Sequence, residues 1–179
     1  QNYMAVAKPD MLSFDHYVFA FGDPWEGGSP TPLYSSMGKY RTAALGGHNG
    51  DSTKPIPYGM WTQMFRVAGG ATLSESEMSL QYGAAWVYGY TSLHAFRYSS
   101  EDPGNALPSV LFAGPNDTNP TPLFDTVASL NRQTQNLAPA LLRLKSTSLQ
   151  FVRGLHKEGI FNFSNDLHQY TTSWNAATD

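Results

Sequence analysis

Residues 56–98 read IPYGMWTQMFRVAGGATLSESEMSLQYGAAWVYGYTSLHAFRY, and this stretch carries the strongest signal for the fold. Residues 56–67 are rich in apolar and aromatic side chains and predict a buried strand. A helix is expected to follow over about residues 74–87, and a further strand over residues 91–98. Strand, helix and strand in this order predict a βαβ unit, in which the two strands pair in parallel.

Two overlapping capping patterns open the central helix of this stretch. Thr72 and Glu75 stand three residues apart, and so do Ser74 and Glu77. In either pair the hydroxyl and the carboxylate can cap backbone N–H groups at a helix start. The capping role is therefore the first expectation for both glutamates.

The same alternation extends to both sides of residues 56–98. Met11–Phe21 predicts a buried strand, and Tyr34–Leu45 predicts a helix that ends at Gly46. A long helix with apolar residues at three-four spacing begins near Leu123, and Pro139 is expected to kink or divide it. Further strands are expected over residues 148–153 and 161–174. The chain is therefore an α/β protein with parallel βαβ units, and the long loops follow the strands' C-terminal ends.

Composition narrows the classes of function. The 179 residues carry a net charge of -3 and only 14% charged residues, with no basic stripe, so nucleic acid is not an expected partner. There is no cysteine, and no apolar run reaches the roughly 18 residues that a membrane helix needs. The start at Gln1 rather than Met suggests processing or trimming. The aromatic fraction of 13%, beside many neutral polar residues, fits either a tyrosine-rich core or sugar binding.

Several segments resemble the late part of a (β/α)8 barrel of the retaining β-glycosidases, especially β-galactosidase-like families such as family 42. The segments are PDMLSFDHY at 9–17, IPYGMWTQMF at 56–65, HAFRY at 94–98 and PTPLF at 120–124. The similarity covers about residues 9–153. It implies that residues 1–147 are late βα units of the barrel, and that residues 148–179 begin a β-rich extension.

The resemblance also implies an activity and a setting. It implies hydrolysis of β-linked sugars without a cofactor, and, by analogy, a periplasmic or secreted location. The family's acid/base glutamate lies in the first half of the barrel. We therefore expect that half, or a second chain, as the partner, and neither nucleic acid nor a membrane.

Retaining glycosidases need two carboxyl groups, one of which is the nucleophile. Where the resemblance places the nucleophilic glutamate, this chain has Gln63, which cannot act as one. Asp15, inside an apolar strand, is either a substrate-binding or catalytic carboxylate or a buried structural aspartate. Glu75 is the second catalytic candidate, if its helix begins at the mouth of a strand. Glu26 and Glu101 are expected to be solvated loop residues.

Aromatic and amide side chains near the strand ends are the candidates for binding sugar. On strands, alternate residues share a face, so Trp61 and Gln63 are expected to face the same side of their strand, as are His94, Phe96 and Tyr98 on theirs. Tyr17 and Trp25 are further aromatic candidates. The sequence has no metal-binding, phosphate-loop or serine-nucleophile motif.

Three hypotheses follow from these observations. The chain is part of a glycoside hydrolase acting on β-linked sugars, with Asp15 and Glu75 as catalytic candidates. Alternatively, it is a non-catalytic carbohydrate-binding relative, as Gln63 suggests. In the third reading it is a structural domain whose open strand edges pair with another chain.

Overall fold

A three-stranded parallel sheet forms the centre of the molecule. The computed structural model describes residues 3–19, 31–67, 72–99, 107–153, 156–157, 160–161 and 168–176. The sheet strands are β1 (Leu12–Asp15), β2 (Tyr58–Gln63) and β3 (Ser92–Phe96), in the order β1-β2-β3. The predicted α/β class and the parallel pairing of residues 56–66 with residues 10–20 are confirmed.

The register aligns residues of the three strands in rows across the sheet. Asp15 lies opposite Trp61, and Trp61 lies opposite His94. Two rows toward the strand starts, Gly59 lies opposite Ser92, where an added Cβ would meet the Ser92 carbonyl oxygen at 2.9 Å. The lack of a side chain at Gly59 thus lets β2 and β3 approach closely.

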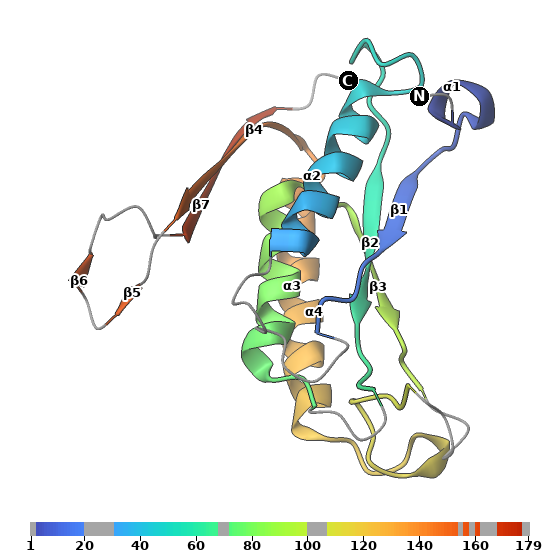
Figure 1. Cartoon of the computed structure of the whole chain (residues 1–179), viewed down its shortest axis with the longest axis vertical. Coiled ribbons are helices and arrows are strands. Elements are labelled where there is room, and N and C mark those ends of the chain that lie inside the picture. The colour runs from blue at the N-terminus through green and yellow to red at the C-terminus, as the bar shows by residue number, and fades with distance from the viewer. Residues whose placement is uncertain are drawn as a thin grey trace.

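All the long helices lie on one face of the sheet (Figure 1). They are α2 (Thr31–Gly46), α3 (Glu75–Tyr88) and α4 (Pro122–Leu141), while the short α1 (Tyr3–Ala7) precedes β1 and the 3-10 turn η1 (Pro115–Asp117) precedes α4. The crossovers from β1 through α2 to β2, and from β2 through α3 to β3, therefore cover the same side. In the described part of the chain the opposite face carries no helix, and we call it the open face.

Capping determines where α3 begins. Of the two patterns in the sequence, the structure uses Ser74, whose hydroxyl accepts a hydrogen bond from the Glu77 N–H. The Glu77 carboxylate accepts in return from the Ser74 backbone N–H at 2.6 Å. At the other end, Gly89 adopts φ +80° as the C-cap, a conformation that glycine adopts without a steric penalty.

Two apolar clusters fill the space between sheet and helices. The first joins the N-terminal halves of the strands to α2 and the end of α3, and includes Met37, Met60 and Ala85, all fully buried. The second lies under α3 and α4 and includes Met64 and Met78, also fully buried. The helix layer is therefore held by apolar packing along its whole length.

A two-stranded antiparallel ribbon follows α4. Its strands are β4 (Leu144–Arg153) and β7 (His168–Ala176), with a register shift between Ser146 and Ser148. Two short strands, β5 (His156–Lys157) and β6 (Ile160–Phe161), pair at its far end, and Figure 1 shows this ribbon extending away from the helices. Arg41 of α2 holds its base, because the guanidinium donates to Ser146 Oγ at 2.8 Å and to the Ser146 carbonyl at 3.1 Å.

Three predicted elements differ from those observed. The strand expected over Met11–Phe21 ends at Asp15, because the chain turns at residues 18–19; residues 20 and 21 lie outside the described part. The strand expected to reach Val67 ends at Gln63. Pro139 does not divide α4, since it lies in the last turn, where the missing N–H removes one hydrogen bond near the end of the helix.

Candidate functional site

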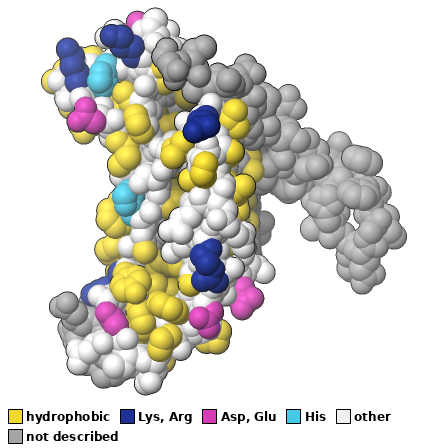
Figure 2. All heavy atoms as spheres, turned by 180° about the vertical axis from the view of Figure 1, so that it is seen from behind, with side chains coloured by type: hydrophobic (Ala, Val, Ile, Leu, Met, Phe, Trp, Pro, Cys, Tyr) yellow, Lys and Arg dark blue, Asp and Glu magenta, His cyan; other side chains and the backbone are white. Residues whose placement is uncertain are grey.

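The C-terminal ends of the three strands bring together most of the predicted site residues. Figure 1 shows that the strands all point toward the same end of the molecule. On the open face at this end lie Tyr17, Trp61, His94 and Phe96, which we call the aromatic face. Seen from behind, hydrophobic side chains gather near the same lower end of the molecule (Figure 2).

The aromatic face is a connected set of ring contacts. The Trp61 ring centroid lies 4.9 Å from that of His94 and 6.3 Å from that of Phe96. Tyr17 stacks on Phe96 at 5.6 Å. Phe65 supports both Tyr17 and Phe96 through edge contacts at 5.0 and 5.7 Å. Trp61 and Phe96 remain 38% and 37% exposed, so the cluster presents ring surface to solvent.

Hydrogen bonding orients His94 within this surface. Its Nε2 lies 2.9 Å from the hydroxyl oxygen of Ser92, two residues earlier on the same strand and face. No hydrogen bond joins its other ring nitrogen to a described residue. The imidazole is therefore held beside Trp61 by one polar and one aromatic contact.

Asp15 is exposed and stands at the edge of the aromatic face. It ends β1 and occupies the same row as Trp61 and His94. Within the described part of the chain, its carboxylate forms neither a hydrogen bond nor an ion pair. The alternative of a buried, structurally paired aspartate is therefore wrong, because the side chain points to the open face. His16 turns the other way, and its Nδ1 lies 2.8 Å from Ser36 Oγ of α2.

The environment of Tyr17 keeps its hydroxyl protonated. Partial burial, with a further contribution from the negative charge of Asp15, raises the pKa of Tyr17 to about 12. At neutral pH the phenol is therefore a neutral group that can donate or accept a hydrogen bond. Tyr17 and Asp15 together place a neutral hydroxyl and a carboxylate beside the ring surface.

Gln63 is buried beneath this surface rather than exposed on it. Only 1% of it is accessible. Its Oε1 accepts from the Phe19 backbone N–H at 3.1 Å, and its Nε2 donates to the Phe65 carbonyl at 3.1 Å. The side chain of Gln81 in α3 accepts from the Gln63 backbone N–H at 2.6 Å. Gln63 thus organises the backbone at the end of β2, a role that the sequence did not indicate.

The remaining site candidates lie at the margin of the aromatic face or away from it. Tyr98 is 54% exposed and contacts Phe112 at 5.5 Å, so it extends the ring surface beyond Phe96. Glu75 is exposed in the first turn of α3, in the layer of helices, whereas Asp15 lies on the open face. Trp25, Glu26 and Glu101 lie outside the described residues.

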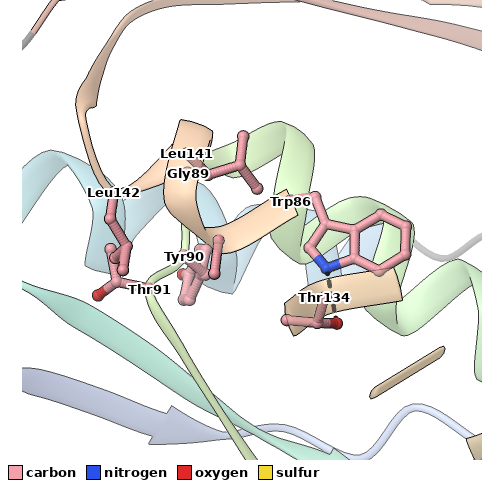
Figure 3. A pocket seen from close by; sticks show the side chains of 8 residues that line it. Trp86, Gly89, Tyr90, Thr91, Thr134, Leu141 and Leu142 are labelled. Carbon is pink, nitrogen blue, oxygen red and sulfur yellow. Dashed lines mark hydrogen bonds between the residues drawn. The ribbon is translucent and has the colours of Figure 1, made fainter. Parts of the chain in front are cut away.

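Hollows also lie away from the aromatic face in the described part of the chain, and two of them bracket the range of sizes. A cavity of about 60 Å³ opens between α3 and α4, where Trp86 Nε1 donates to Thr134 Oγ1 at 3.2 Å (Figure 3). It is far smaller than the roughly 300 Å³ of ordinary ligand pockets. A hollow of about 840 Å³ lies between α1 and the C-terminal turn of α2, at the opposite end of the sheet from the aromatic face. Neither hollow includes an aspartate or a glutamate.

The described residues hold no group of three histidine, aspartate or glutamate side chains placed to bind a metal ion. None of their helices combines the length and hydropathy needed to cross a membrane.

Comparison with known proteins identified no relative. No family model, curated protein or solved structure matches the chain. Inference about function therefore rests on the geometry of the aromatic face.

Proposed function

We propose that this chain supplies part of the carbohydrate-binding mouth of a (β/α)8 barrel related to the glycoside hydrolases that act on β-linked sugars. The observation that carries the proposal is the aromatic face itself. Exposed rings of Trp61 and Phe96 offer flat apolar surface for the C–H faces of a sugar. Asp15, His94 and Tyr17 stand around these rings as hydrogen-bonding partners for hydroxyl groups.

The topology supports a barrel origin. Strands in sequential order, with both crossover helices on one face, are the arrangement of a (β/α)8 barrel, whose other face becomes the interior. Doubly wound sheets instead carry helices on both faces. Ligands of barrel enzymes bind at the C-terminal ends of the strands, and the aromatic face lies at that end.

Completing such a barrel takes further strands. A (β/α)8 barrel has eight strands in about 250 residues, and the described sheet has three. In this proposal the remaining strands come from another part of a longer chain or from a second chain, and they supply the acid/base carboxylate. A periplasmic or secreted location belongs to the same proposal, by analogy with enzymes of this type.

One observation favours a second candidate, a non-catalytic sugar-binding barrel. Gln63 stands at the position that resembles the nucleophile. Its side-chain amide is hydrogen-bonded to the backbone N–H of Phe19 and to the carbonyl of Phe65. A carboxylate in that environment would face a carbonyl oxygen without a donor. This second candidate is expected to bind sugar without hydrolysing it. If hydrolysis is observed instead, Asp15 and Glu75 are the carboxylates whose substitution tests the catalytic role.

Calorimetric titration with β-linked oligosaccharides, together with an aryl β-glycoside turnover assay, tests the proposal. Binding with turnover supports the hydrolase, and binding without turnover supports the non-catalytic candidate. If neither binding nor turnover is found with the protein in its full-length form, the carbohydrate proposal is wrong.

A further inference from the structure

The charge at the edge of the aromatic face bears on which sugars it can take. Neighbouring strands of a sheet lie roughly 4.8 Å apart, and Asp15 and Trp61 are direct register partners on adjacent strands. A sugar ring stacked on the Trp61 indole therefore has its substituents close to the Asp15 carboxylate. An ionised carboxylate only accepts hydrogen bonds, and a sugar hydroxyl group can donate one to it.

No described lysine or arginine is paired with the Asp15 carboxylate. The arginine nearest in sequence to the aromatic face, Arg97, donates instead to the carbonyls of Ser99 and Leu107 at 2.9 and 3.3 Å. Arg41 is bound to Ser146 on the helix side. An anionic sugar stacked on Trp61 would thus meet a like charge without a compensating cation.

Tyr17 and His94 are the other hydrogen-bonding groups of the aromatic face. Tyr17 keeps its proton at neutral pH, and the His94 imidazole bonds to the Ser92 hydroxyl. Hydroxyl groups of a sugar can donate to Asp15 and exchange hydrogen bonds with Tyr17 or His94. A carboxylate or sulfate in their place would lose the bond to Asp15 and gain repulsion.

We propose that Asp15 is a specificity-determining residue that makes the aromatic face select uncharged sugars over uronic acids and sulfated sugars. This inference rests on the proposed carbohydrate function. Two unit charges about 4 Å apart in water repel by enough to change affinity about fivefold. Salt screens such a surface interaction, so the preference should shrink as ionic strength rises.

The test compares matched ligands that differ in one group. Tetramers of β-linked glucose, galactose or mannose are titrated against the same tetramers in which C6 has been oxidised to a carboxylate. For the unmodified protein at low salt, we expect the neutral form to bind at least about fivefold tighter. Raising the salt to about 1 M should reduce this ratio, because the Debye length falls to about 3 Å.

Substitution assigns the preference to one side chain. Asp15→Asn keeps the shape, removes the charge and should bring the ratio close to one. Asp10→Asn makes the same change at an exposed residue before the start of β1, at the opposite end of the strand, and should leave the ratio unchanged. Circular dichroism checks that both variants fold.

The outcomes separate this inference from the proposed function. If neutral and oxidised tetramers bind equally, or if Asp15→Asn leaves the ratio unchanged, the inference is wrong while carbohydrate binding stands. If no tetramer of any kind binds, the proposed function and the inference fall together. A preference for the oxidised form would also overturn the inference.

Discussion

Gln63 illustrates how one buried side chain limits the chemistry of a neighbouring surface. Its amide bonds to Phe19 and Phe65, and Gln81 bonds to its backbone. These contacts require a donor and an acceptor on the same side chain, which a glutamine provides and an ionised glutamate does not. Gln63 is therefore suited to a structural role at the end of β2.

Gln63→Glu should destabilise the protein in a pH-dependent way. Burial and the Phe65 carbonyl oxygen should raise the pKa of the new carboxyl above about 4.3, its unfolded value. A raised folded-state pKa means that stability is retained below pH 4 and lost as the pH rises through neutrality. The free energy of unfolding obtained from thermal melts should fall between pH 4 and pH 8 by about 1–3 kcal/mol more than it does for the parent protein.

Gln133→Glu is the matched control, because Gln133 is exposed on α4. It should show no comparable loss of stability at pH 8. If Gln63→Glu is as stable as the parent at pH 8, the buried hydrogen bonds of Gln63 do not have the role described here.

Trp61→Ala should weaken sugar binding with little effect on folding. The indole is 38% exposed and forms the centre of the aromatic face, so its removal takes away stacking surface rather than core. We expect an affinity loss of at least about tenfold by calorimetric titration, which corresponds to about 1.4 kcal/mol. Tyr3→Ala removes a more accessible aromatic ring, 67% exposed, from α1 and should leave binding unchanged. Equal effects of the two substitutions would argue against the aromatic face as the binding site.

At the scale of elements, the start of α3 depends on a reciprocal cap. Ser74 and Glu77 satisfy backbone N–H groups at this end, and α3 packs against both α2 and α4. A helix start without a cap leaves these donors to water. The capping pair therefore contributes to the stability of the layer of helices that covers the sheet.

Ser74→Ala should lower the free energy of unfolding by about 1 kcal/mol, as measured by urea titration. Ser76→Ala lies two residues further along, inside the helix and exposed, where alanine is a better helix former than serine. That control should be neutral or slightly stabilising. A loss from Ser76→Ala as large as that from Ser74→Ala would show that the cap is not the cause.

At the scale of the whole molecule, buried tyrosines tie the helix layer to the sheet. Tyr58 donates to the Tyr88 carbonyl at 2.8 Å, and Tyr90 donates to the Met37 carbonyl at 2.9 Å. Tyr82 donates to Asn131 Oδ1 at 2.9 Å and so joins α3 to α4. Burial raises the pKa of Tyr58, Tyr82 and Tyr88 to about 12, and raises that of Tyr90 further.

These raised pKa values predict alkaline unfolding. Unfolded tyrosine ionises near pH 10, so the stability from each buried phenol is complete below pH 10 and falls as the pH rises toward 12. The loss should approach about 1.4 kcal/mol per pH unit for each such tyrosine. Denaturant titrations between pH 8 and 11.5 measure it, and Tyr82→Phe should make the decline less steep. A free energy of unfolding that stays constant to pH 11.5 would contradict the prediction.

The open sheet predicts association with another polypeptide. In the described part of the chain, β1 and β3 each pair only with β2, so each presents an unpaired edge. Unpaired edges are templates for further strands, and Phe96 and Tyr98, at and just after the end of β3, expose ring surface near one of them. Light scattering after size exclusion should therefore show residues 1–179 as an oligomer or a complex. A monodisperse 19.7 kDa species with a cooperative melt would contradict this expectation.

The local sequence pattern was sufficient to predict much of the secondary structure of this protein. Period and capping residues in the sequence predicted the parallel βαβ order and the helices now seen as α2, α3 and α4, because these depend on near neighbours in the chain. The sequence also placed Tyr17, Trp61, His94 and Phe96 among the candidate sugar-binding side chains, whereas their contacts come from the pairing of the strands. The proposed barrel and its glycosidase chemistry remain predictions.

Other features depended on contacts between distant segments. The exposure of Asp15, the burial of Gln63 and the choice of Ser74 over Thr72 as the cap could not be read from the pattern. Asp15 stands in an apolar strand and is nevertheless exposed, because α2, α3 and α4 pack on the other face. Gln63 lies between residues 19 and 81, which only the folded chain brings to it. Alternation along a strand specifies which residues share a face, but tertiary packing alone determines which face is covered.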